Sequence, residues 1–246
     1  MSMNTLSKNL NTVMKINIWS DVRCPFCYIG KRKFEKALER FPHKNEVEVT
    51  WHSFQLDPSL ETQTDKSPYD YFVEAKGVSR EQAVKMHNHA AQVAKETGLD
   101  FNFEKAVVAN SFNAHRLIQL AKVMGVANAA EEELFKAHFT DGKNIDDKKT
   151  LVQIGISVGI DKSKVDEMLS SDAFAAEVKQ DELAAQAIGI RGVPFFVFNN
   201  KYAVSGAQSP ETFLQTLEES WKEFEKEKNS LVMVEGESCS ADGTCD

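Results

Sequence analysis

Two cysteines near the start of the chain have the spacing of a redox-active pair. Cys24 and Cys27 enclose Pro25 and Phe26, and they stand where the strand-like run 15–19 gives way to a helical pattern. At this spacing both sulfurs lie within one helical turn, and the free backbone N–H groups of the helix start stabilise a thiolate on the first cysteine. The pattern therefore predicts thiol–disulfide exchange, with Cys24 attacking and Cys27 resolving the mixed disulfide.

The residues beside Cys24 agree with this chemistry. Arg23 adds positive charge next to the first sulfur, and Pro25 suits a first helical turn, where its missing N–H would have no partner. The alternatives are structural burial and a zinc site. Zinc takes four ligands, and the other two would have to be Cys239 and Cys245, so we predict no metal site.

A second cysteine pair lies at the end of the chain. Cys239 and Cys245 belong to a small, polar segment, and the dipeptide Asp242-Gly243 favours a turn that brings the two sulfurs together. We interpret them as a second redox pair that relays electrons to or from Cys24 and Cys27. An incidental disulfide and a metal-scavenging end are the alternatives, and both stay open.

Composition excludes several classes of protein. The 246 residues are 42% hydrophobic and 27% charged, with a formal net charge of −8. The acidic balance argues against a nucleic-acid partner, and no apolar run reaches the roughly 18 residues of a membrane span. The polar stretch 1–14 does not resemble a secretory signal, so we expect a cytoplasmic protein. In that compartment a close cysteine pair is more often catalytic or metal-binding than structural.

The order of predicted elements describes an α/β domain that a helical block interrupts. Alternating strands at 15–19 and 47–51 enclose a helix, and helical periodicity then dominates 58–171. A helix at 173–188 leads to an apolar run, an Asn199-Asn200 turn and a second strand, which together predict a hairpin. A last helix begins after the N-cap residue Ser209. The predicted parts are an α/β domain at 15–57 plus 172–228, a helical insertion at 58–171 and a flexible tail at 229–246.

This arrangement resembles a known fold family. A strand, a Cys-x-x-Cys pair, a helix and a late Gly192-Val193-Pro194 before a hairpin resemble the thioredoxin fold, in which a cis-proline loop faces the cysteines. The helical insertion makes the chain similar to the DsbA family. Four longer runs are similar to its FrnE-like members, namely 18–31, 110–116, 192–196 and 205–208.

The resemblance implies a thiol–disulfide oxidoreductase, with disulfide isomerase activity, that acts on protein or peptide thiols. Pro194 would shape the substrate groove opposite the cysteines, and the Val193 backbone would pair with an extended substrate. Pro25 and Phe26 would contact the same substrate. The resemblance implies no cofactor, and glutathione is the expected recycling thiol.

Two other functions compete with this interpretation. Kappa-type glutathione transferases and hydroxychromene carboxylate isomerases share the insertion and act on small aromatic substrates, but they use serine as nucleophile, so Cys24 argues against them. A peptide-binding module with vestigial cysteines is the non-enzymatic alternative. Periplasmic members carry a histidine inside the pair, and Phe26 cannot donate a hydrogen bond to a thiolate, which argues against strong oxidising power.

Three histidines have two interpretations each. His87 and His89 are two residues apart on a predicted helix, so they point about 200° from each other and favour packing over a shared metal. His115 lies in the run 110–116 and either faces the active cleft or belongs to an ordinary polar helix start.

Overall fold

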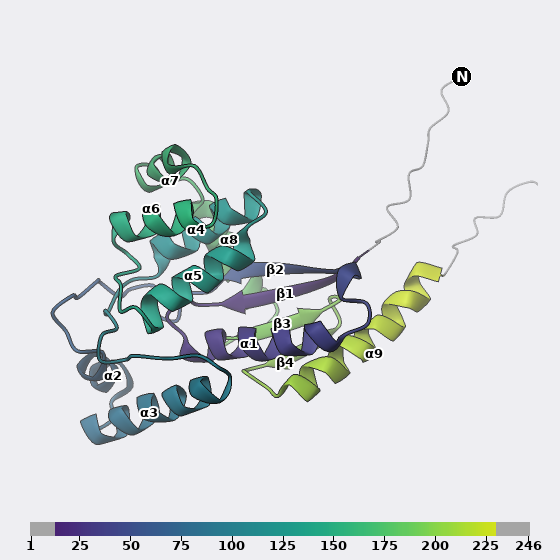
Figure 1. The fold of residues 1–246 in the computed structure, drawn as a ribbon, viewed down its shortest axis with the longest axis horizontal. Coiled ribbons are helices and arrows are strands. Elements are labelled where there is room, and N and C mark those ends of the chain that lie inside the picture. The colour runs from purple at the N-terminus through teal and green to yellow at the C-terminus, as the bar shows by residue number, and fades with distance from the viewer. Residues whose placement is uncertain (1–12, 230–246) are drawn as a thin grey trace, which may run out of the picture.

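The computed structural model describes residues 13–229, which form a mixed four-stranded sheet with helices around it (Figure 1). The strand order is β2-β1-β3-β4. The β1–β2 pair is parallel, and the β1–β3 and β3–β4 pairs are antiparallel. The predicted α/β core with a helical insertion is confirmed. The strands are β1 (Met14–Ser20), β2 (Val47–Ser53), β3 (Phe195–Phe198) and β4 (Tyr202–Ser205).

The helices of the described part divide between the α/β core and the insertion. The core contains α1 (Pro25–Arg40), the short 3-10 helix η1 (Lys44–Glu46), α8 (Ala175–Ala187) and α9 (Pro210–Asn229). The insertion contains α2 (Pro68–Lys76), α3 (Arg80–Glu96), α4 (Phe112–Val123), α5 (Ala127–Phe139), α6 (Lys148–Ser157) and α7 (Lys162–Leu169). None of the helices within residues 13–229 is long and apolar enough to cross a membrane.

Helices cover both faces of the sheet. Ile16 and Ile18 of β1 are fully buried in the main core, which also holds Phe34 of α1 and Phe213 of α9. The ring centroids of these two phenylalanines are 5.8 Å apart. Trp19 faces the other way and packs in a separate cluster with α8. Because successive strand residues point to opposite faces, α1 and α9 cover one side of β1 and α8 covers the other.

The insertion is less completely helical than its sequence predicts. Between α3 and α4 the chain runs without a helix, yet Phe101 and Phe103 are buried there. Phe101 stacks on Phe139 of α5, with ring centroids 4.7 Å apart. The Asn102 N–H donates to the Phe139 carbonyl at 2.6 Å. Aromatic packing and hydrogen bonds to α5 therefore fix the conformation of this segment, which forms no helix of its own.

Polar side chains of the run 110–116 hydrogen-bond to other segments of the insertion. Asn110 donates to the Leu60 carbonyl at 2.7 Å, and Asn113 donates to Asp146 at 2.9 Å. The Arg116 guanidinium donates to three backbone carbonyls, those of Met168, Ser171 and Ala173. These polar side chains thus fix the positions of loops within the insertion.

Two local predictions, the Asn199-Asn200 turn and the Ser209 cap, can be compared directly with the structure. Asn199 and Asn200 have positive φ angles of 47° and 55°, as expected for the turn of the predicted hairpin. Ser209 accepts a hydrogen bond from the Thr212 N–H at 3.2 Å and so caps α9. Asp161 stands at the N-cap of α7, but its side chain makes no capping hydrogen bond.

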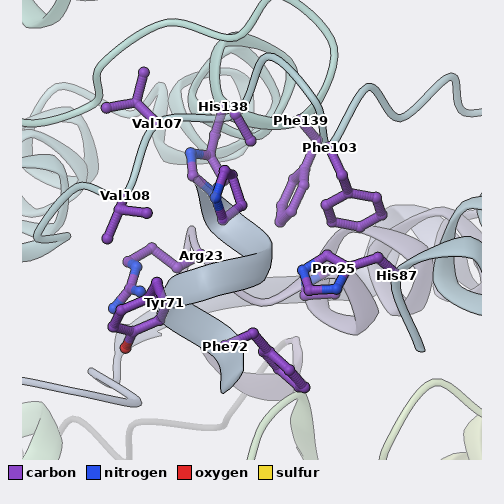
Figure 2. Close-up of a pocket in the computed structure, with 12 residues that line it drawn as sticks. Arg23, Pro25, Tyr71, Phe72, His87, Phe103, Val107, Val108, His138 and Phe139 are labelled. Atoms are coloured by element: carbon purple, nitrogen blue, oxygen red, sulfur yellow. The ribbon is translucent and has the colours of Figure 1, made fainter. Parts of the chain in front are cut away.

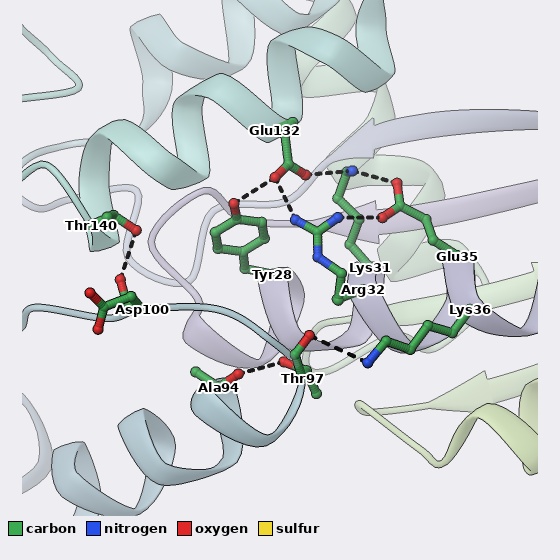
Figure 3. A network of polar contacts seen from close by, with 10 residues as sticks. All are labelled: Tyr28, Lys31, Arg32, Glu35, Lys36, Ala94, Thr97, Asp100, Glu132 and Thr140. Atoms are coloured by element: carbon green, nitrogen blue, oxygen red, sulfur yellow. Dashed lines mark hydrogen bonds and ion pairs between the residues drawn. The ribbon is translucent and has the colours of Figure 1, made fainter.

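A charged network joins α1 to α5 (Figure 3). Lys31 is 2% exposed, and its Nζ donates to Glu132 at 2.7 Å. Glu132 also accepts hydrogen bonds from the Tyr28 hydroxyl at 2.6 Å and from Arg32 at 2.5 Å. Burial and the adjacent Glu132 raise the pKa of Tyr28, so its hydroxyl stays a donor. The network thus attaches the helix that carries the cysteine pair to the insertion.

Candidate active site

The cysteine pair lies at the N-terminus of α1. Cys24 is the N-cap residue, its N–H donates to the Asp21 carbonyl at 2.9 Å, and Pro25 is the first helical residue. The Cys27 N–H donates to the Cys24 carbonyl at 3.0 Å, which closes the first turn. Both are free thiols, 6% exposed for Cys24 and 1% for Cys27. Of the two, only Cys24 also lines a cavity, so it is the more accessible sulfur.

The two thiols have different electrostatic surroundings. Burial, followed by the neighbouring Cys24 thiol, raises the pKa of Cys27 well above its ordinary value. A thiol with a raised pKa stays protonated at neutral pH and is a poor nucleophile until its proton is removed. This asymmetry suits a pair in which Cys27 acts second.

We expect iodoacetamide to label Cys24 well before Cys27 in the reduced protein at pH 7. The reason is that Cys24 is the more exposed sulfur and that burial keeps Cys27 protonated. Mass mapping of the first modified peptide measures the order, and the Cys24→Ser variant provides the rate for Cys27 alone. Faster labelling of Cys27 would reverse the assignment of the two roles.

A proline loop packs directly on the pair. The Cys24 thiol lies 3.5 Å from the Val193 carbonyl oxygen and donates to it, and the Val193–Pro194 peptide bond is cis, as the resemblance to the thioredoxin fold implies. The Gly206 N–H donates to the Pro194 carbonyl at 2.8 Å. A Cβ at Gly30 would lie 2.9 Å from Pro194 Cγ, so only glycine allows α1 to approach the loop this closely.

The residues between the two cysteines face a cavity. Pro25 and Phe26, together with Cys24, line a hollow of about 500 Å³, and Phe26 is 37% exposed. The structure thus brings together four predicted site residues, Cys24, Cys27, Val193 and Pro194, and places Phe26 on the open side. Cys239 and Cys245 lie outside the described residues, so their pairing stays a prediction.

The structure contains a buried ion pair near Cys24 that the sequence did not predict. Asp21 is completely buried; its carboxylate accepts hydrogen bonds from the Arg23 N–H at 3.1 Å and the Leu56 N–H at 2.8 Å. His115 Nε2 of α4 lies 3.4 Å from Asp21 Oδ1. Although burial opposes the charge, His115 and the backbone donors lower the pKa of Asp21. Asp21 in turn raises the pKa of His115, against the effect of burial. His115 therefore faces the interior behind the pair, not the open cleft.

A third buried group, Glu131 of α5, belongs to this charged interior. It is 1% exposed, one of its carboxyl oxygens has no hydrogen-bond partner in the described structure, and burial raises its pKa to about 7. The unfolded carboxyl has a pKa of about 4.3, so the unfolded chain loses its proton first as the pH rises. Glu131 therefore reduces the free energy of unfolding progressively between about pH 4 and pH 7.

We expect Glu131→Gln to stabilise the protein at pH 8 by about 2 to 3 kcal/mol and to have little effect near pH 4. The amide keeps the size of the side chain and removes the cost of its buried charge. Urea unfolding at both pH values measures the difference. Glu133→Gln, on the same helix at a less buried position, is the matched control. Equal effects of the two substitutions at pH 8 would contradict the burial argument.

No group of three or more His, Cys, Asp or Glu side chains within residues 13–229 is arranged to hold a metal ion. His87 instead packs against aromatic rings, with centroids 5.0 Å from Phe72 and 4.7 Å from Phe103. Its Nδ1 lies 2.8 Å from the Ala83 carbonyl. The packing interpretation of His87 thus agrees with its contacts.

Comparison with known proteins identifies relatives along nearly the whole chain. A family model described as a DSBA-like thioredoxin domain matches residues 15–218. The crystal structure of a probable DsbA oxidoreductase from Streptomyces coelicolor is 36% identical, with a TM-score of 0.82, over 95% of this chain and 98% of that one. The uncharacterized protein YwbO of Bacillus subtilis is 26% identical over 84% of this chain and 97% of its own length. The cytosolic disulfide reductase DsbM of Pseudomonas aeruginosa shares the fold at 16% identity, with a TM-score of 0.60, over 85% and 98% of the two chains.

Proposed function

This chain belongs to the DSBA-like thioredoxin family, and on that basis we propose that it is a dithiol–disulfide oxidoreductase acting on protein or peptide thiols. One observation carries the proposal. The partly accessible Cys24 thiol stands at a helix N-terminus, 3.5 Å from the Val193 carbonyl, with the buried Cys27 one turn behind it. Kappa-type transferases and hydroxychromene carboxylate isomerases use serine as nucleophile, whereas this chain supplies a cysteine there and a second cysteine three residues later.

In the proposed reaction the Cys24 thiolate attacks one sulfur of a substrate disulfide and releases the other as a thiolate. Cys27 then loses its proton and attacks the Cys24 sulfur of the mixed disulfide. The products are two substrate thiols and a Cys24–Cys27 disulfide. The reverse sequence oxidises a substrate dithiol, and attack followed by release without resolution rearranges disulfides, which is the isomerase activity included in the proposal.

The proline loop supports a binding mode for an extended substrate. Val193 precedes Pro194 and adjoins Cys24, so a substrate strand that pairs with the Val193 backbone presents its disulfide to the nucleophile. Pro25 and the half-exposed Phe26 form the apolar wall on the cavity side. Pro194 shapes the groove through its contact with Gly30 of α1.

We include glutathione as the thiol that recycles the pair, and the cytoplasm as the compartment. Cytosolic DsbM, which has the same fold, was also solved with glutathione. Glutathione keeps cytoplasmic thiols reduced, so it can return a Cys24–Cys27 disulfide to the dithiol form.

An insulin reduction assay tests the proposal. With glutathione as reductant, the protein is expected to precipitate the insulin B chain faster than glutathione alone, and to convert little chlorodinitrobenzene to its glutathione conjugate. Rapid conjugation without insulin reduction would instead favour the glutathione-dependent transferase alternative. Peptide binding without either activity would favour the non-enzymatic module.

A further inference from the structure

The cavity beside Cys24 is almost entirely apolar. Phe26, Leu56 and Met86 line it and are 37%, 50% and 51% exposed, and Phe72 and Phe103 line its inner part. Its volume of about 500 Å³ lies in the range of pockets that enclose a small molecule. Because the Cys24 sulfur forms part of the wall, an occupant of this cavity adjoins the reactive atom.

We call the cavity beside Cys24 the outer chamber. A smaller recess of about 120 Å³ adjoins it at Pro25 (Figure 2). The two spaces share Pro25, Phe72 and Phe103 as lining residues. His138 projects into the recess from α5 and is 6% exposed, and its Nδ1 has no hydrogen-bond partner in the described structure. A buried polar atom without a partner costs free energy unless a ligand or water supplies the bond.

The charged side chains that line the two chambers are positive. Arg23 lines the recess and Lys85 lines the outer chamber, while no Asp or Glu lines either. Burial lowers the pKa of His138 to about 4, so this side chain is an uncharged hydrogen-bond partner at neutral pH. This distribution is notable in a chain whose formal net charge is −8. The Arg23 guanidinium lies 5.0 Å from the centroid of the Tyr71 ring and makes no ion pair at contact distance within residues 13–229. Its charge also helps to lower the pKa of Asp57, which accepts a hydrogen bond from the Tyr71 hydroxyl but lines neither chamber. The surroundings thus favour an anionic group next to an apolar body.

We infer that the two chambers bind small aromatic disulfides that carry a carboxylate, with the ring in the apolar chamber and the carboxylate at Arg23 and His138. This inference rests on the proposed function, because Cys24 must be a reactive thiol, and it names a substrate class for the same site. Arg23 would form charge-assisted hydrogen bonds with the carboxylate, and His138 would complete its solvation in place of water.

The reaction with such a substrate needs no further reagent for one turnover. The Cys24 thiolate attacks the aromatic disulfide, a Cys24–aryl disulfide forms, and one aryl thiolate leaves. Cys27 then loses its proton and attacks the Cys24 sulfur, which releases the second aryl thiolate. The protein gives up two electrons and forms the Cys24–Cys27 disulfide, and the disulfide substrate accepts them to become two thiolates.

Stopped-flow reduction of two probes by the fully reduced full-length protein tests the inference. Dithiobis(nitrobenzoate) carries the carboxylates, and dithiodipyridine is an uncharged aromatic disulfide. The rate with dithiobis(nitrobenzoate) is expected to saturate as its concentration rises. Arg23→Gln is expected to lower the ratio of the rate constants for the two probes about tenfold, as for the loss of one charge-assisted hydrogen bond. Arg191→Gln, an exposed cation two residues before Val193 but outside both chambers, is expected to leave the ratio unchanged.

A second pair of variants tests the apolar chamber. Met86 and Leu183 are both 51% exposed on helices, but only Met86 lines the chamber. Met86→Glu is expected to raise the half-saturating concentration of dithiobis(nitrobenzoate) severalfold, and Leu183→Glu is expected to leave it unchanged.

Equal effects of Arg23→Gln and Arg191→Gln on the ratio, or of the two glutamate substitutions on saturation, would overturn the site. The reaction with dithiodipyridine distinguishes the loss of the proposed binding site from a failure of the proposed function. If it still yields the Cys24–Cys27 disulfide, as measured by peptide mass mapping, the oxidoreductase proposal stands and only the site is lost. If neither probe yields that disulfide, the proposed function itself is wrong.

Discussion

Replacement of Cys24 by serine is expected to reduce insulin reduction to the rate of glutathione alone. The hydroxyl of serine stays protonated at neutral pH and forms no disulfide, so both steps of the proposed cycle are lost. Cys27 cannot substitute for it, because it is 1% exposed and burial raises its pKa. The turbidity of precipitating insulin B chain measures the loss.

Cys27→Ser is the companion variant, and it is expected to fail differently. It keeps the attacking sulfur, so it should accumulate a stable mixed disulfide between Cys24 and the substrate, which peptide mass mapping detects. Circular dichroism of both variants controls for folding. Insulin reduction by Cys24→Ser at the full rate would show that another group is the nucleophile.

Replacement of Asp21 by alanine is expected to lower the free energy of unfolding by about 3 to 5 kcal/mol, as for loss of one member of a buried ion pair. The substitution removes the carboxylate that contacts His115, which leaves only the more distant Glu131 and Glu182 to balance its charge, and it deprives the Arg23 and Leu56 N–H groups of their acceptor. Urea unfolding monitored by fluorescence measures the change. Asp161→Ala is the matched control, since Asp161 is exposed and makes no capping hydrogen bond; it should stay within about 0.5 kcal/mol of the parent protein.

The pH dependence of this loss follows from the two pKa shifts. The pKa of Asp21 is lowered in the fold, so its contribution is complete above the unfolded pKa of about 3.9 and disappears as the pH falls further. The pKa of His115 is raised, so its contribution is complete below the unfolded pKa of about 6.5 and disappears as the pH rises through the folded value. The difference between parent and Asp21→Ala should therefore be greatest between about pH 4 and pH 6.5. A difference that is constant from pH 3 to pH 9 would contradict the ion-pair assignment.

The reactive pair and its loop could be predicted because their signals are local. The Cys24-x-x-Cys27 spacing, the Pro25 start of α1 and the Asn199-Asn200 turn each depend on a few adjacent residues. The alternation of polar and apolar residues in 15–19 likewise predicts β1, since a period-two pattern depends only on neighbouring residues. These signals sufficed for the α/β core with its helical insertion.

The charged interior and the recess could not be predicted because their members are far apart in sequence. Asp21 and His115 are 94 residues apart, and only the packing of α4 behind the cysteine loop brings them together. Arg23 and His138 meet in the recess for a similar reason. In the sequence, His115 and His138 are single histidines in helical patterns, which are compatible equally with packing and with exposure. The absence of a helix between α3 and α4 could not be predicted either, since the structure of this segment depends on aromatic contacts with α5.

Equilibration of the protein with glutathione at a series of reduced-to-oxidised ratios tests the central claim most directly. After acid quenching and alkylation, peptide mass mapping gives the fraction of molecules in which Cys24 is bonded to Cys27. We predict a single reversible transition from free dithiol to this internal disulfide, with the glutathione adduct at Cys24 only a minor species, because Cys27 lies one turn behind. Absence of the Cys24–Cys27 disulfide at every ratio would show that the two residues are not a redox pair.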